Sequence, residues 1–232
     1  MNSFLELKKI SKSFTSEKTV KVLKNLSKKF YKGKTYSIVG PSGSGKSTLL
    51  NLISLIDRPS SGSINFNKNQ VNFDENEKND VFRSKKIGIV YQQNNLLPDF
   101  TALENIYLAS LAVNNNKELA ISNAEKLLNK IGLSKRADHF PSQLSGGEAQ
   151  RIAIARAIVN DPEIILADEP TGSLDMATAK DIFELLNKQK KSDRLIIYAT
   201  HNRFFANKAD YLLEMSDGSI KSSYARVSDR KF

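Results

Sequence analysis

Residues 40–47 read GPSGSGKS, and this stretch decides the fold of the chain. It fits the phosphate-binding pattern G-x-x-x-x-G-K-[ST]. A short apolar run, residues 36–39, precedes it directly, and a helical pattern over residues 47–56 follows it. A strand, a glycine-rich turn and a helix in this order are the context that the pattern requires. We therefore expect a loop that binds nucleotide phosphates.

The chemistry of this loop follows from its residue types. Glycines allow backbone N–H groups to converge on phosphate oxygens, and the N-terminus of the helix adds about half a positive charge. Lys46 is expected to reach the β- and γ-phosphates of ATP, and Ser47 to ligate Mg²⁺. A plain glycine-rich turn is the weaker interpretation, because the pattern occurs by chance in only about one chain per hundred of this length. The residues expected to contact the nucleotide here are Gly40, Ser42, Gly43, Ser44, Gly45, Lys46, Ser47 and Thr48.

Continuous apolar runs predict a mostly parallel sheet that is covered on both faces. Helical patterns separate these runs, as at residues 150–159, where Pro162 follows and stops the helix. Strands that alternate with helices make the fold class α/β. The predicted strands of this sheet are residues 36–39, 87–91, 164–167 and 195–199.

Two regions interrupt this pattern. Residues 4–30, together with 63–73, hold short apolar segments between turn-prone residues, and we expect a small antiparallel β lobe there. Residues 93–157 lack a convincing strand and predict a helical lobe inserted in the core. The polar stretch 65–80 is expected to be an exposed loop. We treat residues 1–232 as a single domain with these lobes.

The composition limits the class of protein. With 40% hydrophobic residues the chain can bury a sizeable core, and without cysteine it can form neither disulfides nor thiolate metal sites. It has no secretory signal, and its apolar runs fall short of the roughly 20 residues that span a bilayer, so we expect it to stay in the cytoplasm. The net charge of +10 permits an anionic partner. Because the lysines are scattered and not interleaved with aromatic residues, we expect a solvated surface and no specific nucleic-acid site.

Two carboxylates follow the predicted strand 164–167. Asp168 and Glu169 would stand at the carboxyl end of that strand, where open α/β sheets bind ligands. Asp168 is expected to hold Mg²⁺ through water, and Glu169 to polarise the water that attacks the γ-phosphate. Taken alone, a strand-end Asp-Glu pair is more often a helix cap or a turn. Its occurrence beside a phosphate-binding loop favours the catalytic interpretation.

Residues 144–151, LSGGEAQR, resemble the signature of ABC-type ATPases. Ser145, Gly146 and Gly147 open a helix, so their exposed N–H groups form a second anion site in the same chain. The resemblance implies a head-to-tail homodimer, in which the signature of one subunit closes over the γ-phosphate bound by the other. An ordinary serine-capped helix is the alternative interpretation.

Further motifs of the same family follow in order, and the resemblance covers roughly residues 4–220. It implies that Gln92 senses Mg²⁺ and the attacking water, that the loop around Asp175 crosses to the partner subunit, and that His201 contacts the γ-phosphate. Considered alone, Gln92 would be a surface residue and His201 a structural histidine. Their order and their places at strand ends favour the nucleotide roles.

The chain departs from the family pattern at two positions. Phe14 stands where the family often has a tyrosine that stacks on adenine; phenylalanine keeps the stacking face and loses the hydroxyl, and packing in the core is the alternative. Asn202 follows the histidine where many relatives carry aspartate. This change could alter the orientation of His201, although it leaves every direct nucleotide ligand in place.

Residues 92–106, QQNNLLPDFTALENI, look like the lipoprotein-releasing and macrolide-exporter branch of the family. This resemblance implies integral membrane transporter subunits as partners, with Leu96, Leu97 and Phe100 as candidate contacts, and a place at the cytoplasmic face of the inner membrane. Packing of Leu97 and Phe100 inside the helical lobe is the alternative. A related exporter or the cell-division complex is the main alternative. A soluble ATPase of DNA repair or translation would have two cassettes or a long coiled-coil insertion, and an ATP-binding module without turnover would not need Glu169.

Overall fold

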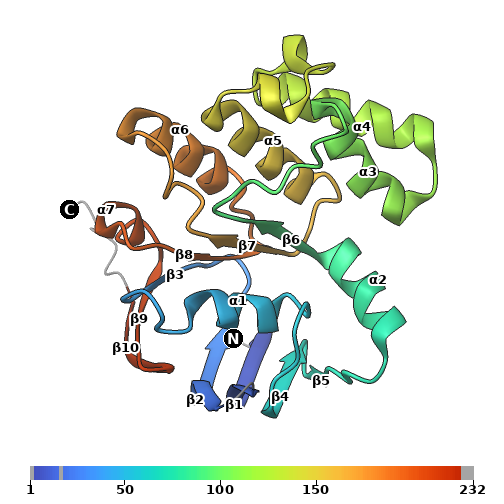
Figure 1. Cartoon of the computed structure of the whole chain (residues 1–232). Helices are drawn as coiled ribbons and strands as arrows, with labels where there is room; N and C mark the ends of the chain where they lie inside the picture. The colour runs from blue at the N-terminus through green and yellow to red at the C-terminus, as the bar shows by residue number, and fades with distance from the viewer. Residues whose placement is uncertain (1–2, 16–17, 226–232) are drawn as a thin grey trace. The chain divides into compact units, whose positions relative to one another are not determined.

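Figure 1 shows the computed structural model, which describes residues 3–15 and 18–225. The chain forms two compact units, and each is described by itself. Unit 1 consists of Met1–Glu75 and Lys191–Phe232, and unit 2 consists of Asn76–Lys190.

The first sheet of unit 1 is mostly parallel. Its strands are ordered β10-β9-β3-β8; β3 runs parallel to both β8 and β9, whereas β10 is antiparallel to β9. Every residue of β3 and β8 is buried, which explains why both strands appear in the sequence as continuous apolar runs. The sequence did not predict the other two strands. The bounds are β3 (Thr35–Val39), β8 (Leu195–Ala199), β9 (Tyr211–Ser216) and β10 (Ser219–Ala225).

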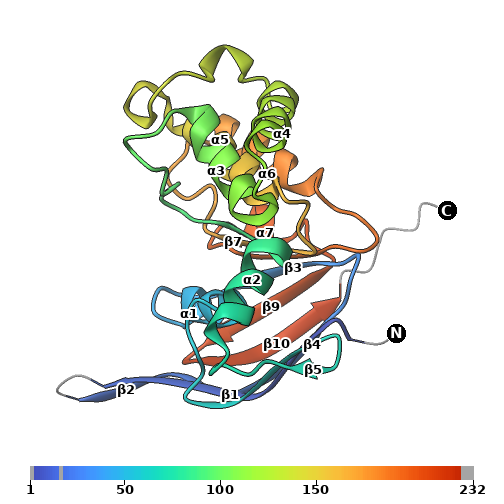
Figure 2. The same cartoon turned by 90° about the vertical axis from the view of Figure 1, so that its right-hand side faces the viewer.

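The second sheet of unit 1 is antiparallel and confirms the predicted β lobe. Its strands are ordered β2-β1-β4-β5 (Figure 2). In β1 the side chains of Leu5 and Leu7 are buried, while Glu6 and Lys8 between and after them are not, because successive residues of a strand point to opposite faces. The sheet therefore has an apolar face and a polar face. The bounds are β1 (Leu5–Thr15), β2 (Thr19–Phe30), β4 (Ser61–Phe66) and β5 (Asn69–Gln70).

Two helices complete the part of unit 1 that the structure describes. α1 (Lys46–Ile53) follows the glycine-rich loop and buries Leu49, Leu50, Leu52 and Ile53. It ends before Ile56, the predicted limit, because Ser54 ends the helix and Leu55 has a φ of 60°. The other helix is the single turn α7 (Arg203–Ala206).

Unit 2 has a parallel pair of strands and five α-helices within its described residues. β6 and β7 are parallel, with Val90 opposite Ala167. The prediction of an exposed loop over residues 65–80 is wrong at both ends, because β4 reaches Phe66 and α2 starts at Asn76. No residue of α2 is buried, so this helix lacks the apolar stripe that would have revealed it. The bounds are α2 (Asn76–Lys86), β6 (Ile87–Val90), α3 (Ala102–Asn114), α4 (Lys117–Lys130), η1 (Ser134–Arg136), η2 (Pro141–Gln143), α5 (Gly146–Ile158), β7 (Ile164–Asp168) and α6 (Met176–Asn187).

The helices α3, α4 and α5 share one apolar core, as predicted for the helical region, and they lie side by side in Figure 1. Thr101 begins α3 with a capping box, in which its side chain accepts a hydrogen bond from the backbone of Glu104. Asn115, at the end of α3, has a φ of 51°, and Asn116 caps α4. The core comprises Leu96, Ala102, Ile106, Ala124, Leu128, Ile131, Leu133, Ala149, Ile152, Ala153 and Ala155. Among the described residues, no helix is long and apolar enough to cross a membrane.

Candidate functional site

Close packing favours glycine at both ends of the phosphate-binding loop in unit 1. Gly45 has a φ of 98° at the N-cap of α1, a conformation that favours glycine. A Cβ there would lie 2.7 Å from Leu23 Cδ2, and one on Gly40 would lie 2.2 Å from the carbonyl oxygen of Met215. Gly43 (φ 76°) has nothing within 4 Å of a Cβ position and is exposed. The loop is thus fixed at both ends and open in the middle, where a ligand could approach its N–H groups.

The polar side chains of this loop suit phosphate. Lys46 Nζ donates to the carbonyl oxygens of Gly40 at 2.9 Å and Pro41 at 3.1 Å, which holds the ammonium over the loop. Ser44 Oγ is buried without a hydrogen-bond partner among the described residues, and a phosphate oxygen would supply one. Ser47 is exposed in the first turn of α1. Amides, an ammonium and hydroxyls are the donors that the phosphates of a nucleotide require.

His201 is placed next to this loop by the sheet. β3 leads into the loop and β8 leads into Thr200 and His201; the two strands are parallel neighbours, with Ile38 opposite Ala199. His201 is exposed. Asn202 is the N-cap of α7 and its Oδ1 accepts from the N–H of Phe204 at 2.9 Å. Asparagine caps helices as well as aspartate does, which accounts for this departure from the family pattern.

Phe14 lies near the end of the β1–β2 hairpin, opposite Val20. Its side chain is 48% exposed, which contradicts packing in the core and leaves the ring available for stacking. Lys12 Nζ stands 4.8 Å from the ring centroid and also binds Asp57 Oδ1 at 2.6 Å. The lysine therefore restricts where the Phe14 ring can turn.

In unit 2 the sheet brings Gln92 and the two carboxylates together. β6 and β7 are parallel neighbours, and Gln92 and Asp168 lie at the same end of the pair. A Cβ on Gly172 would lie 3.2 Å from Gln92 Nε2, so the amide of Gln92 sits against the loop that follows Glu169. The predicted grouping of Gln92 with Asp168 and Glu169 is thus present in the geometry.

Glu169 begins a tight turn. It has a φ of 46°, in the left-handed region that non-glycine residues rarely occupy, and its carbonyl accepts from the N–H of Gly172 at 3.0 Å. Leu174 N–H in turn donates to Thr171 at 3.2 Å. A strained backbone held by local hydrogen bonds is common at functional sites, because it fixes the direction of one side chain.

The signature motif opens α5 with a complete capping box. Ser145 Oγ accepts from Glu148 N–H at 3.2 Å, and Glu148 Oε2 accepts from Ser145 N–H at 2.8 Å. Arg136 Nε donates to Glu148 Oε1 at 2.8 Å and a second Arg136 nitrogen lies 3.1 Å from His139 Nε2. The hydrogen bond from Ser145, followed by that from Arg136, lowers the pKa of Glu148 to about 2. Ser145 does cap a helix, as the alternative interpretation held. Glu148 and Arg136 hold this cap in place through the hydrogen bonds given above.

The two signature glycines differ in what they contact. A Cβ on Gly147 would lie 2.6 Å from Thr178 Cγ2, so α5 and α6 approach too closely for a side chain. A Cβ on Gly146 would meet only Leu174 Cδ2 at 3.5 Å, an ordinary contact. Packing therefore explains Gly147 but not Gly146, whose N–H is at the first turn of α5.

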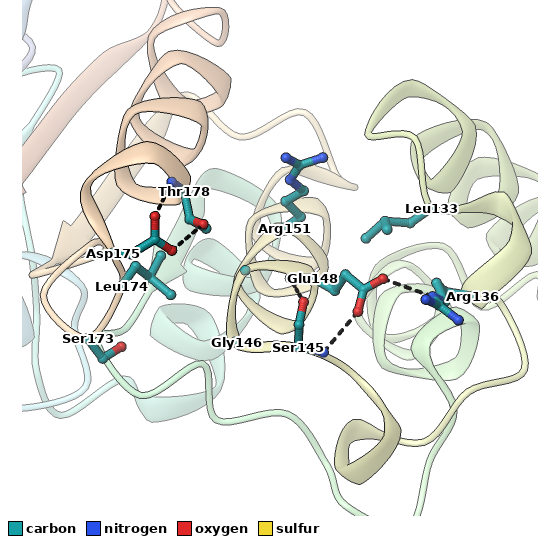
Figure 3. Close-up of a pocket in the computed structure, with 11 residues that line it drawn as sticks. Leu133, Arg136, Ser145, Gly146, Glu148, Arg151, Ser173, Leu174, Asp175 and Thr178 are labelled. Carbon is teal, nitrogen blue, oxygen red and sulfur yellow. Dashed lines mark hydrogen bonds and ion pairs between the residues drawn. The ribbon is translucent and has the colours of Figure 1, made fainter.

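A pocket of about 680 Å³ opens in front of this helix (Figure 3). Asp175 borders it and caps α6: its carboxylate accepts from Ala177 N–H at 3.0 Å and Thr178 N–H at 3.1 Å. The hydrogen bond from the Thr178 side chain, first among several, lowers the pKa of Asp175. Asp175 thus has a role within its own chain besides any contact with a partner. The lining is Leu133, Arg136, Ser145, Gly146, Gly147, Glu148, Arg151, Ser173, Leu174, Asp175 and Thr178.

The sequence did not reveal the side chains that hold the segment after β6. Gln150, buried on α5, donates through Nε2 to the carbonyl of Tyr91 at 3.0 Å, directly before Gln92. Arg156 donates to the carbonyls of Asn94 and Asn95, both at 2.7 Å. The only signal was a glutamine and an arginine within an apolar helical pattern, which could equally have been surface residues.

The same segment presents two apolar side chains. Leu97 is 43% and Phe100 38% exposed, as expected for contacts with a partner. The prediction for Leu96 is wrong, because its side chain is buried in the core shared by α3, α4 and α5. The buried Asn105 shapes this loop: its Oδ1 accepts from Leu97 N–H at 2.7 Å and its Nδ2 donates to the carbonyl of Phe100 at 3.0 Å. Asn105 of α3 therefore helps to hold this loop in the conformation that exposes Leu97 and Phe100.

Comparison with known proteins gives the family. The family model described as ABC transporter matches residues 23–172. The lipoprotein-releasing system ATP-binding protein LolD 2 of Chlorobium chlorochromatii is 43% identical over 227 residues, which cover 94% of this chain and 94% of that protein. LolD of Acinetobacter baylyi is 46% identical over 219 residues, which cover 92% of this chain and 95% of that protein.

Solved structures agree with the fold. The dimeric structure of a post-hydrolysis state of the ATP-binding cassette MJ0796, bound to ADP and Pi, has a TM-score of 0.88 at 36% identity and covers 95% of this chain and 98% of that one. The cbiO1 protein of Clostridium perfringens, part of the transporter complex cbiONQ, has a TM-score of 0.83 at 25% identity and covers 97% and 89%. The predicted fold class is confirmed, and the chain belongs to the ABC transporter family as one of its ATP-hydrolysing cassettes.

Proposed function

We propose that this chain binds ATP with Mg²⁺ as a head-to-tail homodimer, and that hydrolysis drives integral membrane subunits that release lipoproteins from the inner membrane. The observation that supports this most directly is the geometry of two candidate anion-binding loops in one chain. One is the glycine-rich loop before α1, and the other is the capped start of α5, where packing leaves Gly146 unexplained.

The phosphate-binding loop holds the nucleotide. Its N–H groups and the Lys46 ammonium bind the phosphate oxygens, while Ser44 Oγ gains an acceptor. The Phe14 ring stacks on the adenine. The donor set for Mg²⁺ is the hydroxyl of Ser47, the amide of Gln92 and the carboxylate of Asp168, all oxygen ligands of the kind that this hard cation prefers. Held by these residues, the cation would neutralise charge that develops on the β- and γ-phosphates.

Hydrolysis requires a water molecule aligned with the γ-phosphate. Glu169 polarises that water, and its left-handed backbone fixes the direction of its carboxylate. Gln92, which lies against Gly172, orients the same water. His201, at the strand end beside the phosphate-binding loop, donates to the γ-phosphate. Each of these side chains follows the carboxyl end of a parallel strand, where ligands of open α/β sheets bind.

The second anion-binding loop serves the partner subunit. Ser145 and Gly146 line the pocket of about 680 Å³, and we assign this pocket to the γ-phosphate held by the phosphate-binding loop of another copy. The dimeric form of MJ0796 supports this arrangement. Closure of such a dimer depends on ATP, because the phosphate lies between the two surfaces.

Lipoprotein release is the transport role that similarity favours. Three relatives that match over more than nine tenths of the chain are described as ATP-binding proteins of lipoprotein-releasing systems. Leu97 and Phe100 are the side chains through which this subunit contacts a cytoplasmic segment of its membrane partner. Closure of the cassette dimer on ATP then moves that partner.

The experiment is a reconstitution in proteoliposomes that contain the membrane subunits and a fluorescent lipoprotein. With ATP and Mg²⁺ the wild-type chain should release lipoprotein to an acceptor. Glu169→Gln should bind ATP and form a stable dimer, yet hydrolyse on the order of hundredfold more slowly, because it loses the carboxylate that polarises water. Normal hydrolysis by this variant would refute the role of Glu169. Hydrolysis without release by the wild type would refute the lipoprotein role while leaving the ATPase intact.

A further inference from the structure

The two units of the chain differ strongly in net charge. Unit 1 contains 21 Lys and Arg against 10 Asp and Glu, a formal net charge of +11. Unit 2 contains 14 against 15, a net charge of −1. The excess that looks scattered along the sequence therefore belongs to unit 1 alone. A solvated surface without an anionic partner gives no reason for such a division.

Within unit 1 the excess is concentrated in the ribbon formed by β1 and β2. Residues 5–30 contain eight lysines and two glutamates. Lys8 and Lys9 on β1 are exposed, and so are Lys24 and Lys29 on β2. Figure 2 shows the two strands as one long ribbon, and β4 pairs with β1 on the side away from β2. Directly opposed residues of paired strands lie about 5 Å apart, so Lys29, opposite Glu6, comes close to the side chains on the same face of β1.

Lys8, Lys9 and Lys29, but not Lys24, line a shallow pocket of about 740 Å³. Glu6 lies opposite Lys29 and is shared between Lys8 at 3.3 Å and Lys29 at 3.4 Å. The Ser27 hydroxyl is oriented by the N–H of Lys9, which donates to it at 2.9 Å. One carboxylate thus faces several lysines, and the pocket keeps an excess of positive charge. Its lining is Glu6, Leu7, Lys8, Lys9, Ser27, Lys28, Lys29, Gly62 and Ser63.

This basic surface, defined as Lys8, Lys9 and Lys29, lies on the face of the ribbon away from the phosphate-binding loop. The opposite face carries Leu23, which is fully buried and is the side chain nearest to a Cβ position on Gly45. Lys8 and Lys29 have side chains that are 55% and 59% exposed. An anion bound to the basic surface would therefore not compete with ATP for its site.

We propose that the basic surface contacts the anionic phospholipid headgroups of the membrane. A flat, lysine-rich sheet face suits a surface of many negative charges, which attracts each nearby lysine by about 1 kcal/mol. A single-stranded nucleic acid would need aromatic side chains for base stacking, and Phe14 is the only exposed aromatic residue in the described part of residues 5–30. The choice of a membrane also rests on the proposed association with membrane subunits.

The test measures binding of the purified chain to vesicles, without ATP or membrane subunits. The chain should cosediment with vesicles made of equal parts phosphatidylglycerol and phosphatidylcholine, but not with pure phosphatidylcholine. Binding should weaken as salt is raised, because ions screen the attraction beyond about 8 Å at physiological ionic strength. The triple variant Lys8→Gln, Lys9→Gln, Lys29→Gln should bind at least about tenfold more weakly. Its nucleotide binding and basal hydrolysis should stay within twofold of the wild type, which shows that it is folded.

A matched control removes the same charge from unit 2. Lys117, Lys126 and Lys130 are exposed residues of α4, and their replacement by glutamine should leave vesicle binding within twofold of the wild type. Equal losses in both triple variants, or no binding to anionic vesicles, would overturn the proposal. So would displacement from the vesicles by poly(U) at an equal concentration of phosphate, which would identify nucleic acid as the better ligand. None of these outcomes depends on the role of Glu169, so failure here would leave the proposed ATPase mechanism untouched.

Discussion

At the scale of single residues, two adjacent positions are occupied by glycine for different reasons. Gly147 is required by the contact between α5 and α6, whereas Gly146 is not required by any contact in the described structure. A sequence pattern cannot separate these causes, because both positions carry the same letter. The distinction assigns a packing role to one glycine and a ligand-facing role to the other.

Replacement of each glycine by alanine should separate the two roles. Gly147→Ala should lower stability by about 1–2 kcal/mol, because the new Cβ overlaps Thr178 and outweighs the better helix propensity of alanine. Thr178 cannot turn away without losing the hydrogen bond from its Oγ1 to Asp175, at 2.5 Å. Gly146→Ala should unfold at or slightly above the wild-type temperature. Thermal unfolding by circular dichroism checks both, and a Gly146→Ala protein that is the less stable of the two would contradict this assignment.

At the scale of elements, α5 does more than present the signature motif. Gln150 near its start and Arg156 near its end hold the segment that follows β6, on either side of Gln92. Because one rigid helix makes both contacts, the signature and Gln92 cannot move independently without breaking them. Gln150 is therefore a positioning residue for Gln92.

Gln150→Ala should lower the rate of ATP hydrolysis while nucleotide binding by the monomer stays near the wild-type value. The reason is that the carbonyl of Tyr91 loses its partner and the backbone before Gln92 is released. The loss of this buried hydrogen bond should also cost about 1–3 kcal/mol of stability. Steady-state phosphate release, measured well below the unfolding temperature, gives the rate.

Asn160→Ala provides the matched control for that experiment. Asn160 also bonds backbone carbonyls in unit 2, those of Ser84 at 3.3 Å and Ala109 at 2.8 Å, but neither lies next to Gln92. It should lose comparable stability and keep its hydrolysis rate. If both variants slow hydrolysis to the same extent, the effect of Gln150 is general destabilisation and its positioning role is wrong.

At the scale of the whole molecule, the proposed head-to-tail dimer needs two chains to form one complete site. In a head-to-tail dimer each site combines the phosphate-binding loop of one subunit with the signature of the other. A variant defective in the first loop and a variant defective in the second should therefore complement each other when mixed.

Lys46→Ala removes the phosphate-binding ammonium, and Ser145→Arg fills the pocket in front of α5; each homodimer should be nearly inactive. A mixed dimer contains one doubly altered site and one intact site, so mixing the two proteins should restore hydrolysis. Ser145→Arg alone should still bind ATP as a monomer. Phosphate release and the retention of labelled ATP by size-exclusion chromatography measure both effects. Hydrolysis by Ser145→Arg homodimers at the wild-type rate would rule out the assigned role of Ser145.

Much of the fold could be predicted because its elements have strong local signals. The buried strands β3, β7 and β8 are mostly apolar, and the loop before α1 has a recognisable phosphate-binding pattern. α2 was missed because it buries no residue, and β9 and β10 because mixed burial gives them no continuous apolar run. The boundaries of α1 and α5 moved because caps at Ser54 and Ser145, not the apolar pattern, set where these helices end and begin.

The sequence by itself determined the family and the residues of the candidate site, because phosphate chemistry demands particular side chains at fixed spacings along one loop or one strand end. Only the tertiary structure decided which residues hold that site in place. Gln150 contacts Tyr91 over 59 positions, and Lys8 shares Glu6 with Lys29 across two strands. Such contacts depend on how strands and helices pack. The residues that packing brings together are far apart in the sequence and follow no regular spacing, so no sequence pattern reveals them. The basic surface is the clearest case, since its lysines look scattered until the pairing of β1 and β2 brings them to one face.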